Sequence, residues 1–140
     1  MNRITALLFS AVLAMPFGAQ AHDDAHLDKV KAPNGGQLRA AGIYHFELVL
    51  AREAGDPKDR AVAVHVTDHA GTAVASAGAT GTVTLLGKGG AVRVALAPDG
   101  ANRLKGAGRY VADPDLKAVV SVTLAGKPAE QARFTPFQAR

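Results

Sequence analysis

Residues 43–50 have the sequence IYHFELVL, in which two kinds of side chain alternate. One kind is large and apolar, and it comprises Tyr44, Phe46, Leu48 and Leu50. The other kind includes two polar members, His45 and Glu47. Successive side chains of a β-strand point to opposite faces. The alternation therefore predicts a strand whose aromatic face packs on a core and whose opposite face carries a histidine and a carboxylate.

The same period of two returns along most of the chain. Strands are predicted at residues 61–67, 72–76, 82–86, 92–96 and 119–124, with shorter extended pieces at 104, 110–111 and 133–137. Turn signals rich in Gly, Pro, Asn and Asp separate them roughly every eight to twelve residues, and no long helical period interrupts the series. These features predict an all-β fold, a single antiparallel immunoglobulin-like sandwich or small barrel.

The first 21 residues have the features of a secretory signal peptide. Arg3 gives a positive head, residues 4–16 are apolar, and residues 19–21, Ala-Gln-Ala, offer the small side chains that a signal peptidase accepts. The apolar run is shorter than the ~20 residues that cross a bilayer. We therefore expect cleavage after Ala21, a periplasmic location and no membrane span in the cleaved protein.

The remainder of the chain is predicted to have two parts. Residues 22–32 are polar and charged, and we expect a flexible arm that contains His and Asp, with at most one helical turn. Residues 33–140 then form the β domain, which begins at a turn signal, Pro-Asn-Gly-Gly, at 33–36.

Composition excludes several kinds of chemistry. The chain contains no Cys, and its two Met residues, Met1 and Met15, lie in the leader. The β domain therefore has neither disulfides nor sulfur ligands for a soft metal. No Ser lies in a GxSxG turn and no loop has the spacing of a phosphate cradle, so we expect no enzymatic activity. The formal net charge is +4, but the basic residues are scattered, which argues against a nucleic-acid surface.

Every histidine lies in the first half of the chain that follows the leader. The five are His22, His26, His45, His65 and His69. If cleavage makes His22 the first residue, its amine and imidazole can together chelate Cu(II), and a further imidazole would complete a histidine brace. His26 follows on the same segment. The alternative is a solvated acidic arm that happens to begin with histidine.

A second group of candidate ligands lies in the predicted strands. His45 and Glu47 share one face, and His65 points away from the valine face of the next strand. His69 follows in the turn at 68–71. If the two strands pair, two imidazoles and a carboxylate converge, a set suited to Zn(II), Cu(II), Ni(II) or Co(II). The alternatives are a surface cross-strand pair, an exposed His65 and a His69 that only caps its turn.

Two segments resemble a known family. Residues 33–38, PNGGQL, and 41–48, AGIYHFEL, are similar to the N-terminal periplasmic module of CzcB-like adaptor subunits of heavy-metal RND efflux systems. Shorter likenesses follow at 66–71, 96–100, 104–106, 122–127 and 133–134. The resemblance implies heavy-metal handling, with the histidine-rich region as the metal contact. Asn34 stands where many relatives have His, and the adaptors' further domains do not follow, so we expect a free module.

These observations lead to one expected function and its alternatives. We expect a periplasmic accessory of heavy-metal resistance or efflux that binds a divalent transition metal and has an envelope or efflux-system protein as a further partner. The candidate ligands are His45, Glu47 and His65, helped by His22, His26 and His69. The alternative is a structural or protein-interaction β-sandwich whose metal affinity is incidental. A complete histidine brace would instead point to a copper oxygenase.

Overall fold

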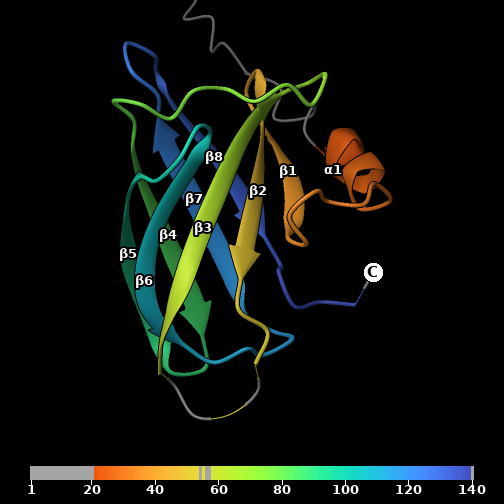
Figure 1. The fold of residues 1–140 in the computed structure, drawn as a ribbon. Coiled ribbons are helices and arrows are strands. Elements are labelled where there is room, and N and C mark those ends of the chain that lie inside the picture. Colours follow the sequence, from red (N-terminus) through yellow and green to blue (C-terminus); the bar gives the residue numbers. More distant parts are fainter. Residues whose placement is uncertain (1–20, 54, 56–57, 140) are drawn as a thin grey trace, which may run out of the picture.

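A computed structural model describes residues 21–53, 55 and 58–139, so the predicted leader lies almost wholly outside the described residues. One short helix, α1 (Ala21–Leu27), precedes eight strands (Figure 1). The strands are β1 (Gln37–Ala41), β2 (Tyr44–Leu50), β3 (Lys58–Asp68), β4 (Thr80–Gly87), β5 (Gly90–Pro98), β6 (Arg103–Tyr110), β7 (Lys117–Thr123) and β8 (Ala129–Phe134).

The eight strands form one antiparallel sheet, which confirms the predicted all-β class. Their order is β1-β2-β3-β6-β5-β4-β7-β8, and the sheet curls until its two end strands, β1 and β8, lie side by side (Figure 1). The side chain of Gln37 links the two ends, since its Oε1 accepts the backbone N–H of Thr135 at 2.9 Å. The result is a nearly closed barrel, one of the two forms that the sequence predicts.

The barrel interior is filled by the apolar sets that alternate along the strands. On β2 and β3 the fully buried members are Phe46, Leu48, Val62, Val64 and Val66, as the period of two predicts. The core consists mainly of Leu, Val and Ala with few aromatic side chains, and close packing requires some strands to approach closely. Gly106 on β6 allows that approach, because a Cβ there would lie 2.2 Å from the carbonyl oxygen of Ala95 on β5.

Several segments differ from the prediction. The piece predicted at 133–137 overlaps β8 only at its first two residues, because the strand runs Ala129–Phe134. Residues 72–76 do not form a strand; a single bridge joins Ala73 to Thr67, and the segment then crosses to the loop before β6, where Ser76 N donates to Ala101 O. Conversely, β1 was not predicted. All five of its residues are buried, because the core covers one face and the segment around α1 covers the other. A strand buried on both faces loses the alternation by which it would be recognised.

The segment predicted as a flexible arm is docked on β1 and contains α1. The guanidinium of Arg39 donates to Asp28 Oδ1 at 2.7 Å, and its Nε lies 3.7 Å from Asp24 Oδ2. Leu27 and Ala32 form a small apolar cluster with two side chains of β1. Ion pairs and apolar burial therefore hold residues 24–32 against the barrel. In the described part of the chain, no helix has the length and apolarity needed to cross a membrane.

The core packing makes a testable prediction at the start of β2. Phe46 is fully buried, whereas Ile43, in the turn just before the strand, is 68% exposed. We expect Phe46→Ala to lower the free energy of unfolding by about 3–5 kcal/mol, because it leaves a cavity in a core of small side chains. Ile43→Ala, the matched control, should change it by less than about 0.5 kcal/mol. Urea denaturation measures both; equal effects would contradict this packing.

Candidate functional site

The pairing of β2 with β3 brings the predicted ligands to one face of the sheet. Glu47 lies directly opposite His65, and His45 lies directly opposite Thr67. All four side chains alternate with core residues, so they belong to the outer face of the barrel. The register therefore places two histidines and a carboxylate in one neighbourhood, but their side chains have different surroundings.

Glu47 is held inside the protein by the turn that precedes β1. Its side chain is only 3% exposed. Its Oε1 accepts the backbone N–H groups of Asn34 at 2.8 Å and Gly36 at 3.0 Å, and its Oε2 accepts Asn34 Nδ2 at 2.8 Å. A buried carboxylate requires such donors. A metal ion at Glu47 would have to compete with three charge-assisted hydrogen bonds, so Glu47 holds the turn in this arrangement.

His65 lies next to this carboxylate and also next to a cation. It faces Glu47 on β2 and Arg103 on β6 in the strand register. Burial, the largest influence, lowers the pKa of His65; the charge of Glu47 opposes this shift and the charge of Arg103 adds to it. His65 is therefore neutral at pH 7. A neutral imidazole can bind a metal, but a neighbouring guanidinium disfavours added positive charge.

His45 and His69 form the closest histidine pair. Their ring centroids are 4.5 Å apart and the ring planes are inclined by 49°. The Nε2 of His69 lies 3.4 Å from the carbonyl oxygen of Gly42. If this nitrogen carries the proton and donates to that oxygen, Nδ1 of His69 is left as an acceptor. A metal-ligating histidine commonly has this arrangement, with its second nitrogen donating to a carbonyl.

The turn that carries His69 is fixed by its neighbour. Asp68 Oδ1 accepts the backbone N–H groups of Ala70 at 2.9 Å and Thr72 at 2.8 Å. The hydrogen bond from Thr72 is the main cause that lowers the pKa of Asp68. Asp68 therefore holds the 68–71 turn, which the sequence predicts, and positions the next side chain.

The histidine pair opens into a groove of about 580 Å³ between the docked arm and the barrel. His26, Leu27 and Val30 line it from the arm, and His45 and His69 line it from the barrel. Three of the five histidines therefore share one concave surface, which Glu47 also lines. His65 does not line the groove. The side chain of His22 lies outside the described residues.

These contacts do not form a complete metal centre within the described residues. In that part of the chain, no three His, Asp or Glu side chains are close enough together to hold one ion. Two imidazoles approach each other, whereas the nearby carboxylates, Glu47 and Asp68, bind backbone N–H groups. Any ion at His45 and His69 would need further ligands from water, from the arm or from a partner.

The sequence analysis did not predict which groups donate hydrogen bonds to the carboxylate of Glu47. The turn at 33–36 was recognised, but Asn34 was interpreted as the loss of a ligand. In the structure Asn34 supplies two of the three hydrogen bonds to the carboxylate. The one sequence feature that hints at this contact is an outward-facing Glu that follows an Asn-Gly-Gly turn by about ten residues. The period-two pattern of a strand carries no information on contacts between such distant residues.

Comparison with known proteins finds no matching family model, no similar curated protein and no similar solved structure. The resemblance to CzcB-like adaptors therefore remains a prediction.

The contacts of Glu47 predict that its side chain stabilises the turn at residues 33–36. We expect Glu47→Ala to lower the free energy of unfolding by roughly 2–4 kcal/mol, because it removes a charged acceptor and leaves N–H donors unsatisfied. The backbone amide of Gly36 should exchange its hydrogen much faster in this variant. Denaturation and amide exchange test this. Gln131→Ala, at an exposed position of β8, is the control and should change neither quantity.

The surroundings of His65 predict a pH dependence. Its pKa is below the ordinary 6.5, so the unfolded chain takes up this proton before the folded chain does. The contribution of His65 should therefore reduce stability as the pH falls from about 6.5 toward the folded pKa. NMR titration of the ring measures that pKa, and Arg103→Met should raise it by removing a like charge. A wild-type value at or above 6.5 would contradict the prediction.

Proposed function

We propose that this protein is a periplasmic binder of divalent transition-metal ions and serves as an accessory in heavy-metal handling or efflux. The observation that carries the proposal is the pair of imidazoles, His45 and His69, 4.5 Å apart at the edge of a groove. Imidazole nitrogen suits Zn(II), Cu(II) and Ni(II), and the chain has no Cys that would favour a softer ion.

The position of the pair supports exchangeable binding. Two side chains supply two ligands, so the remaining positions of an ion are open to water or to a third group. His26 lines the same groove and is the nearest further imidazole on the arm. An ion held by few protein ligands dissociates readily, which suits a protein that passes metal to another component. Glu47 keeps the groove in shape by holding the turn beside it.

The leader-like residues 1–21 and the absence of Cys support the cellular side of the proposal. An exported protein works in an oxidising compartment, where a free thiol would be a liability. A metal site built from imidazoles is not altered by that environment. The resemblance of residues 33–48 to heavy-metal efflux adaptors also supports a role in metal handling.

Metal titration of the purified, tag-free protein tests the proposal. We expect calorimetry at pH 7.5 to detect Zn(II) or Cu(II) binding clearly tighter than millimolar. We expect His45→Ala and His69→Ala each to weaken it at least tenfold. Binding should also weaken in acid, because protonated imidazole cannot be a ligand. Cu(II) electron paramagnetic resonance would report nitrogen ligands directly.

His65→Ala is the matched control, since His65 lies on the same outer face but does not line the groove. It should leave the metal affinity unchanged. Wild-type affinity no better than millimolar, or full affinity in the His45→Ala/His69→Ala double variant, would reject the proposal.

The second candidate is a protein-interaction module. One observation favours it: within the described residues, β1 pairs only with β2 and β8 only with β7, so the seam where these two strands lie side by side has no backbone ladder, and a partner strand could insert there only by opening it. The two edges at such a seam can accept a strand from a partner. Capture of an envelope protein that persists in the presence of chelator, together with negligible metal affinity, would favour this candidate.

A further inference from the structure

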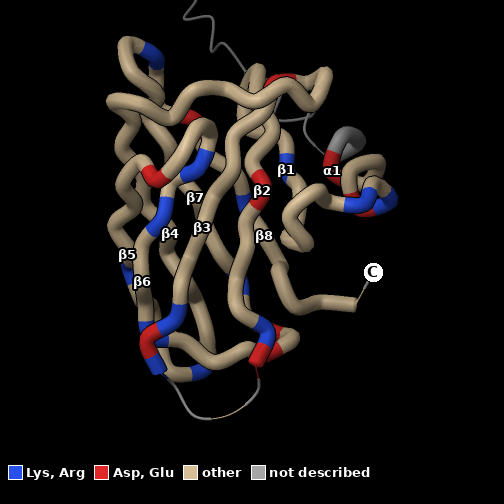
Figure 2. Tube along the Cα trace, viewed as in Figure 1, with Lys and Arg blue, Asp and Glu red and all other residues tan. Residues whose placement is uncertain are grey.

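A second pocket, of about 430 Å³, lies along the side of the barrel where β8 comes close to β1. Three basic side chains line it: Arg39 on β1, Lys117 on β7 and Arg133 on β8. Among the described residues, no Asp or Glu lines it. Charges are mixed elsewhere on the molecule, and Figure 2 shows basic and acidic residues together where β2 ends and β3 begins. The pocket therefore gathers positive charge on one part of the surface.

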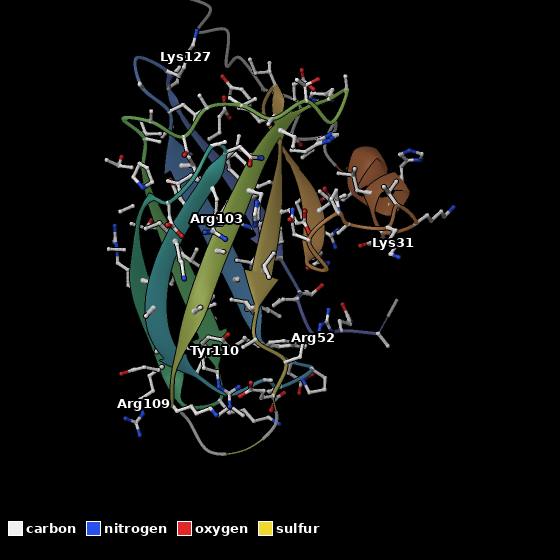
Figure 3. All side chains as sticks on the ribbon, in the orientation of Figure 1. Lys31, Arg52, Arg103, Arg109, Tyr110 and Lys127 are labelled. Carbon is white, nitrogen blue, oxygen red and sulfur yellow. The ribbon has the colours of Figure 1, made fainter. Side chains whose placement is uncertain are left out.

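Two of these cations have no partner in the described part of the chain. Lys117 and Arg133 are exposed, and neither side chain makes an ion pair or a hydrogen bond with a described residue. Arg103 differs, because it donates to Asp99 Oδ2 at 2.7 Å on the face of the barrel seen in Figure 3. The charges of Lys117 and Arg133 are therefore available to a ligand.

The strand register places these two cations on the same outer face. Val119 lies directly opposite Arg133, and Lys117 is two residues before Val119 on β7. Lys117 and Arg133 are therefore diagonal neighbours, a spacing of about 7–8 Å in a β-sheet. Like charges on neighbouring strands repel each other, and an anion bound between the two side chains would remove that repulsion.

The third cation, Arg39, contributes less free charge. Its Nη1 donates to Asp28 Oδ1 at 2.7 Å, and its Nε lies 3.7 Å from Asp24 Oδ2. These carboxylates belong to the helical segment that docks on β1. They offset the charge of Arg39, so a ligand in the pocket meets two uncompensated cations.

Every polar side chain that lines the pocket can donate a hydrogen bond. Arg and Lys have donors and no acceptor. The remaining polar side chain is that of Thr135, whose Oγ1 accepts Gln37 Nε2 at 3.5 Å. Its hydroxyl proton is left for another acceptor. The pocket therefore requires a head group that is negatively charged and consists of acceptors.

Apolar side chains line the space beside the cations. Leu86 on β4 lies directly opposite Lys117 and is 42% exposed. Val119 and Phe134 also line the pocket. An exposed leucine next to two cations favours a ligand that carries an apolar group on its anionic head.

We propose that this pocket binds a small soluble phosphomonoester that carries an apolar group, such as an aryl phosphate. The phosphate lies between Lys117 and Arg133, and the apolar group packs on Leu86 and Val119. A phosphomonoester has a charge of about −1.5 to −2 at pH 7 and three acceptor oxygens, which match two cations and a hydroxyl donor. A monocarboxylate would offset only one of the cations. The volume lies within the range of about 300–1,000 Å³ of ligand sites.

The inference does not rest on the proposed metal function, because no histidine lines this pocket. Binding is therefore measured on protein that a chelator has freed of metal. A phosphate compound that binds only after metal is added would then be assigned to the imidazole groove, and that result would contradict the present proposal.

Three probes separate the parts of the ligand. Phenyl phosphate has the head group and the ring, inorganic phosphate has only the head group, and phenol has only the ring. We expect calorimetry at pH 7.5 to detect phenyl phosphate binding, and the other two to bind at least tenfold more weakly. Affinity should fall below about pH 6, because the phosphate then takes up its second proton. Added salt should weaken binding as well, since it screens exposed charges.

Variants at the rim test the role of each side chain. Lys117→Gln and Arg133→Gln should each weaken phenyl phosphate binding at least tenfold without lowering the melting temperature, because both side chains are exposed. Leu86→Ala should weaken phenyl phosphate but leave inorganic phosphate unchanged. Arg93→Gln, at an exposed position of β5 outside the pocket, is the control and should bind phenyl phosphate normally.

Four results would overturn the proposal. The first is wild-type protein that does not bind phenyl phosphate. The second is equal binding of phenyl phosphate and inorganic phosphate, which would show a surface that attracts any anion. The third is an equal loss of binding in Arg93→Gln and Arg133→Gln, which would show a diffuse effect of net charge. The fourth is binding to vesicles of phosphatidic acid that phenyl phosphate does not compete for, which would assign the cations to a membrane surface.

Discussion

The carboxylate of Glu47 is the interaction on which the outer surface of this barrel depends. It is buried on the face of β2 that points away from the core, where a charge needs donors to offset its lost hydration. The turn at 33–36 brings three N–H groups to it. That contact fixes the chain just before β1. The ion pairs of Arg39 then bind the helical segment to the same face. A groove exists beside His45 because these two contacts hold its far wall in place.

The interior follows a different constraint. Its side chains are mostly Val, Ala and Leu, so little apolar area is buried per residue and the strands must lie close together. Gly106 and Gly108 permit that approach between β6 and β5. At the seam, β1 and β8 have no backbone ladder between them, and the side chain of Gln37 takes its place. The barrel is therefore closed partly by side-chain hydrogen bonds.

The chemistry of the surface is divided between regions that do not overlap. The imidazoles of His26, His45 and His69 gather in the groove formed by the arm, β2 and the turn after β3. The buried guanidinium of Arg60, with two nitrogens that have no acceptor among the described residues, lies near the start of β3. The strand β3 runs between the two regions: Arg60 is its third residue, and His69 directly follows its last residue.

The sequence alone determined which side chains face the core and which face outward on β2 and β3, because a period of two leaves a strand no other way to bury Phe46 and its neighbours. It also determined that residues 16–140 can offer a metal only nitrogen or oxygen ligands, because they contain neither Cys nor Met. Only the tertiary structure decided what each outward residue contacts. Glu47 was expected to be a ligand but accepts the N–H groups of a turn, and β1 was missed because burial on both faces erases the alternation. The pairing of His45 with His69 and the unsatisfied edge of Arg60 depend on strand register and on a turn, which are long-range contacts that no local pattern contains.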